Sequence, residues 1–332
     1  MLKTRSYWIV LLSLFLGLVG AKSLGDRAIE LSCWPGGYAQ NGWMAYCNSD
    51  RYGVFDVEGV WNRVEPDLVP AIQAARVLTL SDSHLQNALS LGGADAWFSA
   101  HGYRFYMLGL PWQQSGFGER IIDSFRPHPE VLILDASPYF TGEIGFETTP
   151  MFKDLAASSR KAQELHDFQA WHQGICAKLA WACGHTFAYF RSRVDGHWIF
   201  PATNKSIWNG RNSVPNDDRR YPTDSRPPEE IALYPTYLQN ARRLLAKLSV
   251  RPSCIVITHV PSERNMKGLA QYIGDALGLR VVEPQVADLA TFDNSHLTPR
   301  SSILWTQAFL EQLAPVLREC TSQGAMSASN VR

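Results

Sequence analysis

Four short and almost uninterrupted apolar runs constrain the fold of this chain more than any other feature. They are "RVLTLS", "RFYMLGL", "VLILD" and "CIVITHV", and stretches with helical spacing lie between them. Strands of a parallel sheet that is covered on both faces read as continuous apolar runs, because neither face meets water. Alternation of such strands with helices predicts an α/β fold. We therefore expect a three-layer α/β/α sandwich with a mostly parallel sheet.

The 332 residues are enough for one large domain that carries an insertion. Residues 22–73 are rich in glycine, tryptophan and tyrosine, and we predict an irregular N-terminal segment there. The α/β domain is expected over residues 74–320, with a helical and loop insertion at about 141–230. Residues 321–332 are predicted to form a C-terminal tail.

The first 21 residues have the pattern of an export signal. Lys3 and Arg5 precede an uncharged run from Tyr7 to Ala21. That run is short for a transmembrane helix, which needs about 20 apolar residues. Small residues near its end fit a signal-peptidase site, so residues 1–21 are a signal peptide or an uncleaved signal anchor. Either interpretation predicts a periplasmic or secreted chain, in contact with a membrane only through such an anchor.

Charge and cysteine content exclude some classes of protein. The 31 basic and 31 acidic residues balance, and no basic stretch favours a nucleic-acid partner. Cys33 and Cys47 bracket a glycine-rich loop that a disulfide could close in an exported protein. No cysteine or histidine cluster has the spacing of a structural zinc site, and we predict no metal site and no cofactor.

The segment "LTLSDSHLQNAL", residues 78–89, places hydroxyl and carboxyl groups where a strand turns into a helix. Ser81, Asp82 or Ser83 could cap that helix by accepting hydrogen bonds from its first amides. The alternative is that one of the two serines attacks a substrate, with Asp82 as the structural cap. The local sequence is compatible with both interpretations.

A second polar group of residues precedes the last helix of the chain. Asp293 and His296 are three residues apart, and Thr298 followed by Pro299 is a typical helix start. Within one tight turn, this spacing can put the carboxylate and the imidazole on the same side. The aspartate would then hold the histidine tautomer and leave the other ring nitrogen to deprotonate a serine.

A serine-bearing turn after the first strand and an Asp-x-x-His block before the last helix resemble the SGNH (GDSL-type) hydrolase superfamily. "SDSHL" is similar to the family's Gly-Asp-Ser block, and "DNSHL" is similar to its Asp-x-x-His block. The resemblance implies a flavodoxin-like fold, Ser83 as nucleophile, and Asp293 and His296 as its partners. It also implies that Gly109 in "MLGLP" supplies an amide to the oxyanion hole, together with the amide of Ser83.

The chain departs from the family pattern at two places. Ser81 stands where the family has glycine, which reduces backbone freedom at the turn. The asparagine that donates to the oxyanion has no match in "LILDASPYF", where Ser137 is the substitute that we predict. Loss of one such donor costs about 2.7–4 kcal/mol of transition-state stabilisation.

Secreted members of the family often act on acyl groups of cell-envelope glycans. The resemblance therefore implies a serine acyl-ester hydrolase or O-acyltransferase, with acetyl as the expected group and a polysaccharide as its partner. The alternative is a catalytically weak module that binds polysaccharide within an export or modification assembly.

Three further residues are predicted to contact substrate. Trp198 and Trp208 flank a polar loop in the insertion, and tryptophan rings pack well on sugars. His84 follows the predicted nucleophile; we interpret it as positional, with shaping of the acyl pocket as the alternative that would give it a substrate contact. His259 ends another strand, and we interpret it as a buried structural histidine rather than as part of the site.

Overall fold

A computed structural model describes residues 10–17, 20, 43–47, 57, 59–64, 67–110, 114–136, 138–142, 159–160, 163–164, 167, 171, 188–199, 220–224, 231–263, 266 and 268–329. Its α-helices are α3 (Leu68–Ala74), α4 (Ser83–Leu91), α5 (Ala94–Ala100), α6 (Ser115–Phe125), α9 (Tyr234–Leu245), α10 (Leu269–Leu277) and α11 (Pro299–Ser329). Short 3-10 helices are η2 (Pro138–Thr141), η4 (Ile231–Leu233) and η5 (Pro252–Cys254). The strands are β1 (Trp43–Cys47), β2 (Val77–Ser81), β3 (Phe105–Gly109), β4 (Val131–Asp135), β5 (Ala188–Ser192), β6 (Trp198–Ile199), β7 (Tyr221–Pro222), β8 (Ile255–Thr258), β9 (Arg280–Val281) and β10 (Ala290–Thr291).

The central sheet has five strands in the order β3-β2-β4-β8-β9, and every neighbouring pair is parallel. In chain order this is the 2-1-3-4-5 arrangement of flavodoxin-like folds. The chain leaves β2 toward β3 on one side and returns to β4 on the other. Ligands of such sheets bind at the carboxyl ends of the strands beside this reversal. The predicted α/β sandwich is thus confirmed.

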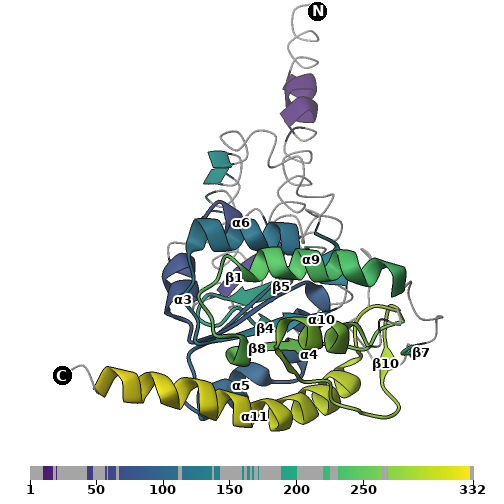
Figure 1. The fold of residues 1–332 in the computed structure, drawn as a ribbon. Coiled ribbons are helices and arrows are strands. Elements are labelled where there is room, and N and C mark those ends of the chain that lie inside the picture. Colours follow the sequence, from purple (N-terminus) through teal and green to yellow (C-terminus); the bar gives the residue numbers. More distant parts are fainter. Residues whose placement is uncertain are drawn as a thin grey trace, which may run out of the picture.

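Side-chain alternation along the strands divides the core into two halves. Leu78 and Leu80 of β2 pack with apolar residues of α3, α6, α9 and α10, whereas Val77 packs with α4, α5 and α11. Figure 1 shows α6 and α9 along one side of the sheet and α5 and α11 along the other. Because both faces are covered, β2, β3, β4 and β8 are buried at every position.

The core begins earlier in the chain than the expected boundary at residue 74. Val57 and Val60 are fully buried in the same cluster as Leu68 and Ile72 of α3. The segment predicted as irregular therefore contributes a helix, because its apolar residues cover the sheet beside α6. At the other end, α11 continues to Ser329 and includes most of the expected tail.

Two described parts of the insertion join the α/β domain. The β5–β6 hairpin lies beside the edge strand β3, where the Met107 amide donates to Asp195 O at 2.7 Å. β7 pairs antiparallel with β10, which leads into the turn that carries Asp293 and His296. The insertion thus contacts both segments that flank the expected site.

The described residues include only some of those on which the N-terminal and cysteine predictions depend. Residues 10–17 are helical, and among the described residues no helix combines the length and apolar character needed to cross a membrane. The predicted pairing of Cys33 with Cys47 lies outside the residues whose side chains are described. A disulfide does join Cys254, before β8, to Cys320 in α11.

This disulfide should contribute measurably to stability. It closes a loop with a sequence separation of 66 residues, which in the chain-entropy model corresponds to about 4 kcal/mol. The double variant Cys254→Ala/Cys320→Ala is expected to unfold at a lower urea concentration, with an equal or larger m-value because its unfolded chain is less compact. The single variant Cys254→Ala is the control and should lose nearly as much. Equal midpoints for the wild type and the double variant would contradict the contribution.

Candidate active site

The carboxyl end of β2 carries the serine that the sequence singles out. Asp82 caps α4 by accepting a hydrogen bond from the His84 amide at 2.9 Å. Ser83 is therefore the first residue of the helix and is 6% exposed. Amides of a first helical turn have no acceptor within the helix, and the helix dipole makes this end positive.

The Asp-x-x-His block forms a tight turn between β10 and α11. The Phe292 amide donates to His296 O at 3.0 Å. One carboxylate oxygen of Asp293 accepts from the backbone amides of Ser295 at 3.0 Å and His296 at 2.7 Å. The other oxygen is 2.8 Å from His296 Nδ1. Burial favours the neutral acid, but the charge and hydrogen bonds of His296 outweigh it and keep the pKa of Asp293 below its ordinary value.

The structure brings this turn onto the start of α4. His296 Nε2 lies 2.8 Å from Ser83 Oγ, across 213 residues of sequence. Because His296 Nδ1 faces the Asp293 carboxylate, its proton belongs there, and Nε2 is left to accept from the serine hydroxyl. Ser83, His296 and Asp293 thus have the geometry of a nucleophile, a general base and the group that orients that base.

Ser81 has a different environment. Its hydroxyl donates to the carbonyl oxygen of Asp82 at 3.1 Å, and the residue is 2% exposed at the end of β2. Of the two serines that the sequence left open, Ser83 is the one in contact with His296.

The oxyanion role predicted for Gly109 is not supported. Its amide donates to the Gln86 side-chain oxygen at 2.9 Å, and the Gln86 amide nitrogen donates in turn to Gly196 O at 2.9 Å. A Cβ atom at residue 109 would lie 2.7 Å from the carbonyl oxygen of Asp82. Glycine is therefore required because β3 approaches the serine turn closely. Ser137, the other predicted donor, lies outside the described residues.

His84, the residue expected to shape the acyl pocket, has a hydrogen-bond partner at each ring nitrogen. Nδ1 is 3.0 Å from Asp82 Oδ1, and Nε2 is 2.7 Å from Ser295 Oγ. Burial opposes a charged ring, but Asp82, together with Asp135 and Asp293, outweighs it and raises the pKa of His84 to about 9. At neutral pH this histidine is a buried cation.

Trp198 is not available to a sugar ring. It is 2% exposed and packs in the core, with the Arg191 guanidinium carbon 5.4 Å from its ring centroid. Arg191 is itself buried and donates to Gly109 O at 2.6 Å and to Met107 O at 3.0 Å. The tryptophan therefore helps to fix the β5–β6 hairpin on the sheet. Trp208 lies outside the described residues.

His259 follows β8 and is 7% exposed, as expected for a buried histidine. Neither ring nitrogen has a hydrogen-bond partner among the described residues. Burial and the nearby charge of His84 lower the pKa of His259 to about 4, so this ring is neutral.

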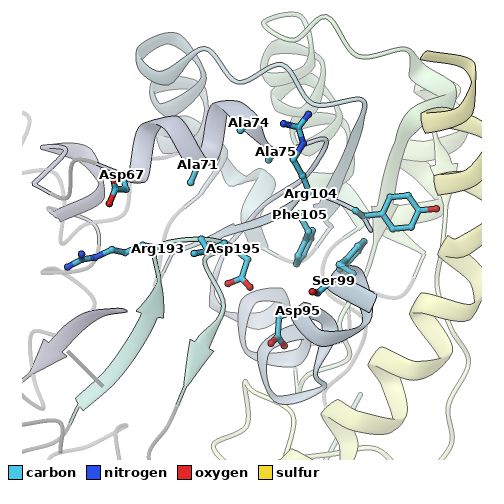
Figure 2. A pocket seen from close by; sticks show the side chains of 13 residues that line it. Asp67, Ala71, Ala74, Ala75, Asp95, Ser99, Arg104, Phe105, Arg193 and Asp195 are labelled. Carbon is cyan, nitrogen blue, oxygen red and sulfur yellow. The ribbon is translucent and has the colours of Figure 1, made fainter. Parts of the chain in front are cut away.

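A cavity of about 630 Å³ lies at the opposite edge of the sheet (Figure 2). Its lining includes Ala75 before β2 and Phe105 at the start of β3. Strands of five residues separate it from the carboxyl edge by roughly 13 Å, at about 3.3 Å per residue. Figure 2 also shows the carboxylates of Asp95 and Asp195 in its lining.

Asp95, Asp195 and His197 bring their ligand atoms within 4.8 Å of one another, as a metal site would require. However, His197 Nδ1 already lies 2.6 Å from Asp195 and Nε2 lies 3.6 Å from Asp95. These contacts hold the β5–β6 turn against α5, and we assign the cluster this structural role.

Sequence reasoning missed the roles of Gln86, Ser295 and Arg191. Gln86 lies within the quoted segment "LTLSDSHLQNAL", and Ser295 lies within the "DNSHL" block. Their partners come from distant segments, which the motifs do not identify.

Comparisons of the chain with protein-family models, with curated proteins and with solved structures gave no match.

The buried cation at His84 predicts a pH dependence of stability. Its pKa in the folded protein, about 9, is above the ordinary 6.5, so its contribution is complete below pH 6.5 and is lost as pH rises through 9. The free energy of unfolding should fall by up to about 3 kcal/mol over this range. Urea titrations of the wild type and His84→Gln should therefore converge as pH rises. Curves that stay parallel would contradict a charged His84, and His128→Gln, at an exposed position, is the control.

Proposed function

We propose that this chain is an extracytoplasmic serine acyl-ester hydrolase or O-acyltransferase that acts on an acylated glycan. The observation that carries the proposal is the chain of contacts Ser83–His296–Asp293, with 2.8 Å at each step. A helix-capping serine needs no such histidine, and a solvated Asp-x-x-His turn needs no serine. Their combination at the carboxyl edge of the sheet favours nucleophilic catalysis.

In the first half-reaction, Ser83 Oγ attacks the carbonyl carbon of an ester while its proton passes to His296 Nε2. The carbonyl π electrons move to the oxygen, and Asp293 stabilises the imidazolium that forms. The oxyanion is adjacent to the Ser83 amide at the positive end of α4. His296 then gives its proton to the leaving alkoxide as the carbon–oxygen bond breaks, which leaves an acyl group on Ser83.

In the second half-reaction, a hydroxyl acceptor gives its proton to His296 and attacks the acyl carbon. Ser83 leaves and recovers its proton from the imidazolium. Water as acceptor completes hydrolysis, whereas a sugar hydroxyl completes transfer. The same three residues serve both outcomes.

Other observations support the proposed location and substrate class. The Cys254–Cys320 disulfide fits an oxidising compartment, as the N-terminal export pattern does. The glycan rests on the sequence resemblance alone, because Trp198 is buried.

The oxyanion geometry favours a second candidate function, a catalytically weak module that binds polysaccharide. The Gly109 amide is occupied by Gln86, and no asparagine follows β4 in "LDASPYF". Turnover distinguishes the two functions, since a binding module would not release acyl groups through Ser83.

A fluorophosphonate probe tests the proposed nucleophile. The wild type should be labelled on the Ser83 peptide, because His296 Nε2 lies 2.8 Å from this hydroxyl and can accept its proton. Ser83→Ala should lose the label and slow p-nitrophenyl acetate hydrolysis by about 10³-fold or more. Ser81→Ala is the matched control two residues away and should keep both. Labelling of Ser83→Ala at the wild-type rate would overturn the proposal.

A further inference from the structure

Two aspartate–histidine pairs lie side by side at the site. Asp293 holds His296, the proposed base, and Asp82 holds His84. The two imidazoles are stacked, with ring centroids 5.2 Å apart and planes 19° from parallel. The proposed mechanism uses only one of these pairs, so the second needs an explanation.

The second pair connects the serine turn to the Asp-x-x-His turn. His84 Nε2 and Ser295 Oγ are 2.7 Å apart, and the two residues are separated by 211 positions in sequence. A second bond between these turns joins Ser83 to His296, and its proton must move in every half-reaction. The His84–Ser295 bond takes no part in that transfer, so it can hold the turns together throughout the cycle.

The charges around His84 determine which group donates in each of its hydrogen bonds. Its ring is faced by Asp82 from the cap of α4, Asp135 from the end of β4, and Asp293 and His296 from the turn, with neutral His259 after β8. A protonated ring donates from both nitrogens, so Asp82 and Ser295 are both acceptors. Hydrogen bonds from a charged donor are shorter and stronger than neutral ones.

We propose that His84 is a positioning residue for the reaction, which fixes the Asp293–His296 turn against Ser83 through its bond to Ser295. The inference rests on the proposed function and deepens it. In this role His84 acts through Ser295 and does not itself take the proton of Ser83. Its effect is on the alignment of the base with the nucleophile, and a displacement of about 1 Å in such an alignment can cost about 10²-fold in rate.

The test uses three variants of the full chain with p-nitrophenyl acetate. His84→Gln and Ser295→Ala should each lower kcat by about 10- to 100-fold and leave KM nearly unchanged. Ser295→Thr keeps a hydroxyl at a half-buried position and should recover most of the loss. His128→Gln is the matched histidine control at an exposed position and should behave as the wild type.

Hydrogen–deuterium exchange separates positioning from folding. In His84→Gln and Ser295→Ala, exchange should rise in the peptide that contains residues 292–297, while the strands of the sheet keep their protection. Wild-type kcat in either variant would overturn the inference, as would exchange that rises throughout the domain. A wild-type protein that shows no labelling of Ser83 would overturn the proposed function, and this inference with it. Labelled wild type with unaffected variants would overturn the inference alone.

Discussion

The hydrogen bond between Ser83 and His296 depends on the parallel sheet more than on either motif. All five strands run the same way, so the segments that follow them collect at one edge. β2 delivers Ser83 there, and the chain after β9 and β10 delivers Asp293 and His296. Two covered faces keep the strands buried, which makes the edge a fixed platform for groups that are 213 residues apart.

Several ionisable groups are buried at this edge, and the free-energy cost of burying their charges is offset by contacts between them. An isolated buried charge is strongly unfavourable, so buried charges occur in pairs with satisfied hydrogen bonds. Asp82 pairs with His84 and Asp293 pairs with His296, and burial opposes the charged carboxylate in both. His259 is neutral instead, because burial and the charge of His84 both disfavour its protonated form. Its ring nitrogens also have no hydrogen-bond partner among the described residues. The arrangement leaves one cation beside a base that must accept a proton.

The apolar runs predicted the buried strands of the central sheet, and the resemblance of "SDSHL" and "DNSHL" to the SGNH blocks implied the meeting of Ser83 with His296. It did not predict what neighbouring groups do with their hydrogen bonds. Gly109 ends the expected strand, yet its amide is bonded to Gln86, a side chain from the first turns of α4. The indole ring of Trp198 is of a kind that stacks on sugars, but the ring is buried in the core, where it contacts the buried Arg191. Gln86 bonds Gly109 across 23 positions and Gly196 across 110, and Arg191 bonds Gly109 across 82, so a local pattern does not identify these partners.

The central claim is that Ser83 carries the acyl group between the two half-reactions. The most direct measurement is rapid-quench mass spectrometry of the purified chain mixed with p-nitrophenyl acetate. The account predicts a transient acetyl group on the peptide that contains Ser83, formed at the rate of the p-nitrophenol burst and lost at the rate of steady-state turnover. Steady turnover with no acetyl group on that peptide, or an acetyl group on another residue that follows the burst, would contradict it.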